Sequence, residues 1–392
     1  MKDATRVVTV GRAPHANSGV VNPPVYHAST ILSPTLAEMR RKDATEDADD
    51  TTYGVHGTPG TFAFEDAVAA LEGGFRTRLC GTGLTACTAP LLCVLSAGDH
   101  LLMTDSVYGP TRRFANKMLR RMGVETTYFD PNIGGAIRDL IQPNTRVVYV
   151  ESPGSLTFEV QDIPTIAAEA HAAGALVLMD NTWASPLYFK PFEHGVDISI
   201  QAATKYIAGH SDLVLGTVTA TEAAYPQIRE GWKELGLNGA PDDVYLAMRG
   251  MRTMHVRMER HWQNGLRIAE WLVERPEVAE VLHPALPGAP GHNLWGRDFL
   301  GASSLFGFTL RSDLSSERHL SALLDDLQLY GMGASWGGFE SLLIPRNPPR
   351  STSAWPTPGR AEGQLMRIHI GLEDPQDLMD DLSDGFARMA QV

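Results

Sequence analysis

A lysine shortly after a predicted strand is the residue of this chain best suited to covalent chemistry. Lys205 follows Ala-Ala-Thr, and the alternating run 196–200 before it predicts a strand. Lysine is rarely buried without a partner, and burial lowers its pKa because desolvation disfavours the charged amine. A neutral amine can attack an aldehyde and form a Schiff base. Taken alone, a lysine in such a motif is more often an exposed loop residue.

An aspartate at the end of another apolar run complements this lysine. Asp180 follows the four apolar residues 176–179, which predict a buried parallel strand. Ligands of open α/β sheets bind just outside the carboxyl ends of such strands. A carboxylate there can pair with the pyridine nitrogen of pyridoxal phosphate, while a lysine binds the aldehyde. The alternative, a turn or capping aspartate, is less consistent with a complementary residue after the next strand.

The segment 199–212 resembles a known family. With its Thr-Lys-Tyr centre and its Gly-His-Ser-Asp end, it is similar to the pyridoxal-phosphate enzymes of cysteine and methionine metabolism, and the similarity extends from about residue 21 to residue 374. The resemblance implies that Lys205 holds the cofactor as a Schiff base and that Asp180 pairs with its ring nitrogen. It also implies the fold-type I architecture, an α/β fold with a mainly parallel sheet, helices on both faces and a smaller α+β C-terminal domain.

Further cofactor contacts follow from a predicted helix start and from the resemblance. Small residues precede the helix that begins near Gly83, and the free N–H groups and dipole of a helix N-terminus attract anions. In the family, the backbone of Gly83 and Leu84 and the hydroxyl of Thr204 bind the cofactor phosphate. Tyr108 corresponds to the tyrosine that stacks on the pyridine ring and can help Lys205 with proton transfer. From the residue alone, Tyr108 could equally be a core tyrosine.

The turn-rich loop 53–60 is expected to contact a neighbouring subunit. The resemblance implies a homotetramer in which Tyr53 enters the active site of an adjacent chain, contacts the phosphate and can take part in proton transfer. Relatives commonly carry a phosphate-binding arginine where this chain has Val55, which cannot donate. His56 follows, but adjacent residues of an extended loop point to opposite sides. We therefore expect neutral donors to replace the arginine. Without the resemblance, Tyr53 is an ordinary loop residue.

Four residues are assigned to the substrate by the resemblance. Arg367 lies in the apolar run 365–370, and its planar guanidinium suits an α-carboxylate. Ser335 lies near that carboxylate in relatives, and a tryptophan at position 336 is typical of the family's β-lyases. Arg113 occupies the position of a substrate-binding arginine. Solvated arginines are the alternative interpretation of Arg367 and Arg113.

The resemblance implies a carbon–sulfur β-lyase that cleaves cystathionine, an amino-acid thioether, to homocysteine, pyruvate and ammonia. Relatives with γ chemistry usually carry leucine after the serine and glutamate before it, whereas this chain has Trp336 and Ala334. The alternatives are a γ-lyase or γ-synthase acting on cystathionine or methionine, and a broad cysteine-S-conjugate β-lyase. A more remote alternative, motivated by Val55, is a cofactor-binding protein without efficient catalysis.

Composition limits the class of protein and its partners. Of the 392 residues, 43% are hydrophobic and 20% charged, as in soluble globular proteins. The net charge of −13 argues against nucleic acid or an anionic membrane surface as a partner. The three cysteines (80, 87 and 93) suggest neither a disulfide framework nor a zinc or other metal site, and they favour reduced thiols in a cytoplasmic protein. No apolar run reaches the length of a membrane span.

The pattern of elements predicts three parts. Residues 1–57 form an N-terminal arm that contacts a neighbouring subunit, 58–250 the large cofactor-binding domain, and 251–392 the C-terminal domain. Strands alternate with helices across residues 80–215, which predicts the parallel sheet. Farther along the chain, we expect a long linking helix at 245–275, a surface loop at 283–301, and antiparallel strands at 304–310 and 365–370.

Overall fold

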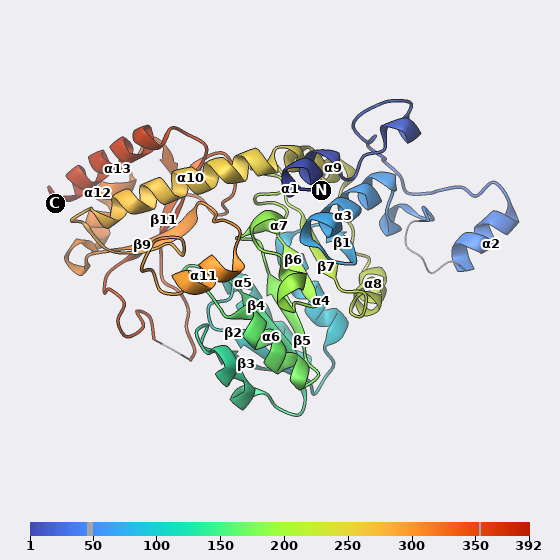
Figure 1. The fold of residues 1–392 in the computed structure, drawn as a ribbon, viewed down its shortest axis with the longest axis horizontal. Coiled ribbons are helices and arrows are strands. Elements are labelled where there is room, and N and C mark those ends of the chain that lie inside the picture. Colours follow the sequence, from blue (N-terminus) through green and yellow to red (C-terminus); the bar gives the residue numbers. More distant parts are fainter. Residues whose placement is uncertain (45–49, 353) are drawn as a thin grey trace.

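The computed structural model describes residues 1–44, 50–352 and 354–392, and these residues form two sheets (Figure 1). The larger sheet has the strand order β1-β7-β6-β5-β4-β2-β3. Strands β2 to β6 are mutually parallel, whereas β7 is antiparallel to both β1 and β6. The predicted, mainly parallel sheet is therefore confirmed. Its strands are β1 (Arg76–Cys80), β2 (His100–Thr104), β3 (Glu125–Phe129), β4 (Thr145–Glu151), β5 (Leu176–Asp180), β6 (Ile198–Gln201) and β7 (Gly216–Ala220).

Alternating side chains of the central strands face two separate cores. Leu178 packs with helices α4 (Gly83–Val94) and α8 (Tyr225–Glu234), whereas its neighbour Val177 packs on the opposite face with α6 (Ile163–Ala172). Both strand side chains are fully buried. Helices on both faces explain why residues 176–179 form a continuous apolar run. Because the strands are buried along their length, polar side chains are accommodated at their ends.

The C-terminal domain contains the smaller sheet, in the order β10-β11-β12-β9-β8. All its neighbouring strands are antiparallel except the short pair β10 and β11. Helices α10, α12 and α13 pack against this sheet through a shared apolar core. Figure 1 shows α10 running from the large domain along the C-terminal domain. The elements are β8 (Val278–Leu282), β9 (Leu305–Leu310), β10 (Tyr330–Gly331), β11 (Ser341–Arg346), β12 (Leu365–His369), α10 (Met254–Val273), α12 (Glu317–Leu324) and α13 (Pro375–Met389).

The predicted long helix at 245–275 is interrupted. Helix α9 (Pro241–Arg252) ends one residue before Thr253, and α10 begins one residue after it. The Arg257 guanidinium donates to the carbonyl of Gly250 at 2.7 Å and to the carbonyl of Tyr206 at 2.8 Å. The bond to Gly250 supplies a partner for a carbonyl at the end of α9. The bond to Tyr206 ties this junction to the segment that carries the predicted catalytic lysine.

The predicted surface loop at 283–301 is wrong in part. Residues 292–298 form helix α11 (His292–Asp298). Leu294 and Trp295 of this helix pack against the core on the α6 side of the large sheet. The prolines and glycines around the helix obscured this short apolar contact in the sequence.

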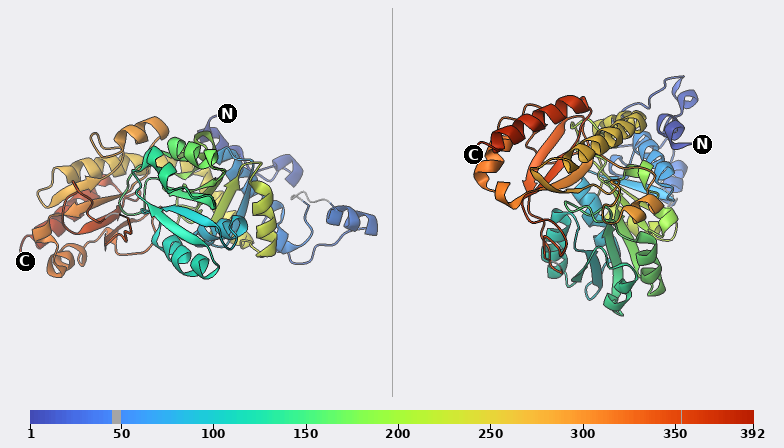
Figure 2. Two further views of the ribbon diagram at one scale, coloured as in Figure 1. Left: turned by 90° about the horizontal axis from the view of Figure 1, so that it is seen from below. Right: turned by 60° about the vertical axis from the view of Figure 1, so that its left-hand side comes forward.

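The first residues of the chain are anchored to the large domain. In helix α1 (Asp3–Thr9), Val7 is only 1% exposed, and Arg252 Nη1 donates to the carbonyl groups of Val7 and Val10 at 3.0 and 2.7 Å. By contrast, helix α2 (Leu36–Ala44) has no buried residue within its bounds and lies at the end of the molecule opposite the C-terminal domain (Figure 2). The contact expected between the N-terminal arm, residues 1–57, and another subunit stays a prediction.

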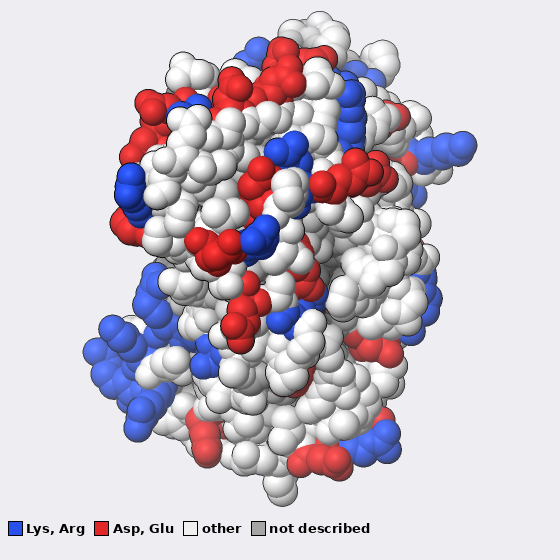
Figure 3. All heavy atoms as spheres, turned by 90° about the vertical axis from the view of Figure 1, so that its left-hand side faces the viewer, with Lys and Arg blue, Asp and Glu red and all other residues white. Residues whose placement is uncertain are grey.

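Charge is unevenly distributed over the surface. On the face that includes the C-terminal domain, acidic side chains predominate in the upper part, and a group of basic side chains lies at the left margin of the lower half (Figure 3). Within the described residues, no helix combines the length and apolar character needed to cross a membrane.

Candidate active site

Lys205 lies shortly after β6, at the carboxyl end of the parallel strands, and faces the C-terminal domain. Its Nζ donates a hydrogen bond to Ser335 Oγ at 2.5 Å and lies 5.2 Å from the centre of the Trp336 ring. Burial lowers the pKa of Lys205 to about 8; the Arg367 guanidinium acts in the same direction, and the Asp180 carboxylate opposes it. The amine is thus closer to its neutral, nucleophilic form than an ordinary lysine.

Asp180 ends β5 and is 9% exposed. Its Oδ1 accepts hydrogen bonds from the backbone N–H and the hydroxyl of Thr182, at 3.0 and 2.6 Å, and the Cys87 thiol approaches Oδ2 at 3.5 Å. Burial nevertheless raises the pKa of Asp180. A protonated ring nitrogen is a partner that would favour the carboxylate form, because opposite charges at close range offset desolvation.

A second carboxyl group, Glu151, lies beside Asp180 and was not identified from the sequence. It ends β4, where the strand register places it opposite Asp180. Its Oε2 accepts a hydrogen bond from the Tyr108 backbone N–H at 2.7 Å. Burial raises the pKa of Glu151 well above its usual range, and the Asp180 carboxylate adds to the effect. A polar residue at the end of an apolar strand was the signal that identified Asp180, and the same signal was available for Glu151.

Tyr108 and Arg113 lie beside these carboxyl groups at helix α5 (Gly109–Phe114). The Tyr108 side chain is partly accessible, at 43% exposure, and burial of its hydroxyl is the main cause that raises its pKa. The charge of the exposed Arg113 acts on Tyr108 in the opposite direction. The preceding residue, Arg112, is buried in an ion pair with Asp105 at 2.5 Å. Of these two arginines, Arg113 is therefore the one whose side chain is exposed.

The N-terminus of α4 offers free donors close to the end of β6. Thr82 caps this helix, but the backbone N–H groups of Gly83 and Leu84 have no protein partner among the described residues. A Cβ on Gly83 would lie 2.6 Å from the Cβ of Ala202, so glycine permits this close approach. The Thr204 hydroxyl donates to the Leu215 carbonyl at 3.2 Å, a bond that it would have to exchange to reach a phosphate.

These groups fit pyridoxal phosphate. Free N–H groups at a helix N-terminus match its phosphate, a lysine of lowered pKa matches its aldehyde, and a buried carboxyl group matches its ring nitrogen. The three come from α4, β6 and β5, which are adjacent in the sheet architecture although they are spread over more than a hundred residues of sequence.

The C-terminal domain contributes a cation beside the lysine. Arg367, on β12, donates from Nη2 to the carbonyl groups of Ser335 and Gly333, at 2.9 and 3.4 Å. Burial lowers the pKa of Arg367 to about 10. Ser335 has a φ of +81°, a conformation that non-glycine residues rarely adopt. Its side chain and its carbonyl thereby contact two different basic groups, Lys205 and Arg367.

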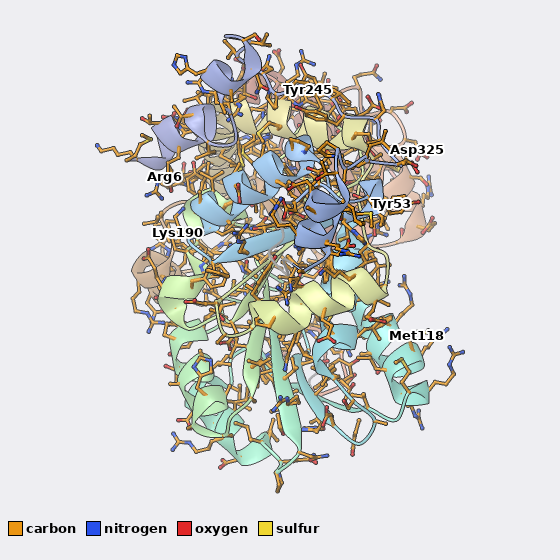
Figure 4. The ribbon with its side chains drawn as sticks, turned by 90° about the vertical axis from the view of Figure 1, so that its right-hand side faces the viewer. Arg6, Tyr53, Met118, Lys190, Tyr245 and Asp325 are labelled. Carbon is orange, nitrogen blue, oxygen red and sulfur yellow. The ribbon has the colours of Figure 1, made fainter. Side chains whose placement is uncertain are left out.

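The loop with Tyr53 lies elsewhere on the chain. Tyr53 is 48% exposed and is visible on the face shown in Figure 4. Together with Val55 and His56 it lines a separate hollow of about 400 Å³. Among the described residues, no hydrogen bond or ring contact joins Tyr53 to Lys205, Asp180 or Tyr108. Its role in a neighbouring subunit stays a prediction.

The expectation of an extended loop at this position is wrong. Residues 54–56 form a 3₁₀ turn, and the backbone N–H of Gly54 donates to Ser29 at 2.8 Å. Val55 and His56 consequently line the same hollow instead of pointing to opposite sides. His56 Nδ1 lies 3.0 Å from the Thr52 hydroxyl.

Comparison with known proteins places this geometry in a family. The family described as Cys/Met metabolism PLP-dependent enzyme matches residues 4–387. Cystathionine β-lyase MetC of Escherichia coli is 41% identical over 98% of this chain and 98% of its own length. The L-alanine/L-glutamate racemase of Wolbachia pipientis is 40% identical over 99% of this chain and 98% of its own.

A solved structure, that of metB from Corynebacterium glutamicum, is 29% identical and matches with a TM-score of 0.90 over 99% of this chain and 98% of that chain. The expected fold-type I architecture is therefore confirmed, as is the dependence of the family on pyridoxal phosphate. The chain belongs to the pyridoxal-phosphate-dependent enzymes of cysteine and methionine metabolism.

Proposed function

We propose that this protein is a carbon–sulfur β-lyase that cleaves cystathionine to homocysteine, pyruvate and ammonia. The observation that carries the proposal is the placement of Ser335 and Trp336 directly against the Lys205 amine, because a tryptophan at this position is typical of the family's β-lyases. The relative from Escherichia coli named cystathionine β-lyase, similar over nearly the whole chain, supports it.

The proposed chemistry depends on the state of one amine. Pyridoxal phosphate, when bound, supplies an electron-accepting ring that stabilises negative charge at the substrate Cα. Lys205 is the base that removes the Cα proton, and a pKa of about 8 gives it a useful neutral fraction near neutral pH. The Cβ–S bond then breaks, and the sulfur leaves with the bonding electrons. Lys205 gives the proton that it took from Cα to this sulfur, and the product is homocysteine. Addition of water to the remaining three-carbon fragment yields pyruvate and ammonia.

Arg367 is proposed to bind the substrate α-carboxylate. Among the described residues the hydrogen bonds of Arg367 come from Nη2 only, so its Nε and its Nη1, which lie on opposite sides of the guanidinium, each remain able to donate to a carboxylate. A planar guanidinium suits such a partner. Ser335 and Trp336 complete this side of the site, and the exposed Arg113 is placed to meet the distal end of an amino-acid thioether.

The cofactor is proposed to lie between Tyr108 and the end of β5, with its ring nitrogen at Asp180. Its phosphate would meet the Gly83 and Leu84 N–H groups, the Thr204 hydroxyl and Tyr53 of an adjacent subunit. This arrangement requires at least a dimer, and we propose a homotetramer. Three cysteines without disulfides in the described structure are compatible with the cytoplasm as its compartment.

The proposed function is tested by incubating the purified holoprotein with cystathionine and identifying the keto acid. Pyruvate together with homocysteine is the expected result. 2-Oxobutyrate with cysteine would establish γ-lyase chemistry instead. Parallel reactions with other cysteine S-conjugates would show whether the enzyme is selective for cystathionine.

Amino-acid racemisation is a second candidate function. The relative named L-alanine/L-glutamate racemase is 40% identical over nearly the whole chain, which favours this possibility. Racemisation shares the removal of the Cα proton with β-elimination, but the proton returns to the opposite face of the same carbon. Incubation with L-alanine, followed by chiral chromatography, measures this activity. A rate for D-alanine above the rate for pyruvate from cystathionine would make racemisation the principal function.

A further inference from the structure

We propose that His369 is a positioning residue that holds the loop Ser335–Gly337 against both Lys205 and Arg367. The expected effect of His369 on catalysis rests on the proposed function, whereas its contacts with the loop are independent of the reaction. His369 lies on β12 two residues after Arg367, so both side chains project from the same face of the strand. Arg367 is partly exposed, whereas His369 is buried to 1% exposure beneath the loop.

The hydrogen bonds around His369 define which nitrogen carries the proton. The backbone N–H of Gly337 lies 3.1 Å from His369 Nε2 and can only donate, so Nε2 accepts and is unprotonated. The Gly338 carbonyl is also near Nε2, at 3.3 Å, but a proton on that nitrogen would leave the Gly337 N–H without its partner. His369 is therefore the acceptor that anchors the backbone of the loop.

The other ring nitrogen is held from the opposite side. Nδ1 lies 3.2 Å from Ser304 Oγ, and the Ser304 hydroxyl donates to the Ile370 carbonyl at 2.5 Å. With its own proton directed to Ile370, Ser304 accepts from Nδ1. Burial and the neighbouring His261 both keep the pKa of His369 well below its usual range, which is consistent with a neutral ring that accepts at one nitrogen and donates at the other.

The loop needs an external anchor because its backbone is unusual. Ser335 and Gly337 have φ values of +81° and +84°. A Cβ on Gly337 would lie 3.0 Å from the Cβ of Lys205, so the loop packs directly on the lysine. A non-glycine residue in the left-handed region persists only where surrounding contacts fix it. The bond from Gly337 to His369 is such a contact, one residue from Trp336.

A displacement of this loop would affect two groups at once. Ser335 Oγ accepts from Lys205 Nζ, and the Ser335 carbonyl accepts from Arg367 Nη2. Small changes in the loop therefore alter the alignment of the amine with the carboxylate-binding guanidinium. His369 touches neither group directly and acts only through the Gly337 backbone.

Two substitutions of His369 separate its two hydrogen bonds. In His369→Gln the amide oxygen can reach the place of Nε2 and accept from Gly337. In His369→Asn the shorter side chain can replace only the bond from Nδ1 to Ser304. His283→Gln is the matched control, because His283 is equally buried in the same domain, at 1% exposure, and its Nδ1 accepts from the Ala285 backbone away from the loop.

The first measurement is amide hydrogen exchange of the peptide spanning residues 333–340 in each purified holoprotein. We expect exchange about threefold to tenfold faster in His369→Asn, the factor that corresponds to one neutral hydrogen bond, and nearly unchanged in His369→Gln. The second is steady-state cleavage of cystathionine. His369→Asn should show a raised KM and a similar loss in kcat/KM, and His369→Gln should recover most of it.

Equal effects of the Gln and Asn substitutions, or no effect of either on exchange in 333–340, would overturn the proposal. The same change in His283→Gln would also overturn it, because the cause would then be general destabilisation. If the exchange pattern is as expected but the wild-type protein does not release pyruvate from cystathionine, the positioning role stands and the proposed function fails.

Discussion

The neutral fraction of Lys205 in the apoprotein is the quantity on which the proposed chemistry most depends. With a pKa of about 8 in place of the ordinary 10.5, about 9% of the amine is neutral at pH 7, against roughly 0.03% for an ordinary lysine. Only the neutral amine is nucleophilic. At pH 7, Lys205 should therefore react with an acylating reagent about 300-fold faster than an equally accessible lysine of ordinary pKa. Competitive acetylation of the apoprotein between pH 6 and pH 11, followed by peptide mass spectrometry, measures this titration.

Two variants test the causes of this shift. The Arg367 charge lowers the pKa of Lys205, so Arg367→Gln should move the midpoint of acetylation upward. The Asp180 carboxylate raises it, so Asp180→Asn should move the midpoint downward. Lys117, an exposed lysine, serves as an internal reference for reagent concentration in every sample. A wild-type midpoint near 10, or shifts of the opposite sign in the two variants, would refute the electrostatic reasoning.

Three further predictions concern cofactor attachment and the subunit interface. Borohydride treatment of the holoprotein should fix the cofactor on Lys205, and Lys205→Ala should lose turnover by several orders of magnitude; peptide mapping to another lysine would contradict the site. Val55→Arg should tighten cofactor binding about tenfold to hundredfold, the gain from one hydrogen bond to a charged group, measured by titration of the apoprotein. Unchanged affinity would mean that another group, such as His56, already serves the phosphate. Mixed oligomers of Tyr53→Ala and Lys205→Ala chains should recover activity that neither parent has, because one site then combines both intact residues; recovery should be absent if each site is built from one chain.

The sequence predicted the central strands and their polar ends because these depend on local patterns. The apolar run 176–179 forms β5 with Asp180 at its end, as predicted, since a buried parallel strand needs apolar residues on both faces. The pairing of β1 with β7 was not predictable in this way. It joins Arg76 to Ala220, far apart in sequence, and neither segment shows by itself which strand it will meet.

The Tyr53 loop shows a second limit of local patterns. Gly54 packs so closely on residue 28 that a Cβ would lie 2.0 Å from the Ala28 carbonyl oxygen. An isolated bridge between Thr30 and Tyr53 fixes the same contact. The turn at 54–56 is therefore set by a segment more than twenty residues earlier. A sequence pattern confined to the loop could not reveal it, and the orientation expected for His56 was wrong for that reason.

The charged groups of the candidate site share one property, which suggests how the site is completed. Burial raises the pKa of Asp180 and Glu151 and lowers the pKa of Lys205 and Arg367, so each group is displaced toward its neutral form. The two carboxyl groups cannot stabilise each other's charged form, and neither can the two basic groups, because like charges at close range disfavour ionisation. A ligand that brings a cationic ring nitrogen to Asp180 and a carboxylate to Arg367 would favour the charged forms of both groups. Binding of cofactor and substrate should therefore be coupled to protonation: the pKa of Asp180 should fall when the cationic nitrogen arrives, and Arg367 becomes harder to deprotonate when the carboxylate arrives.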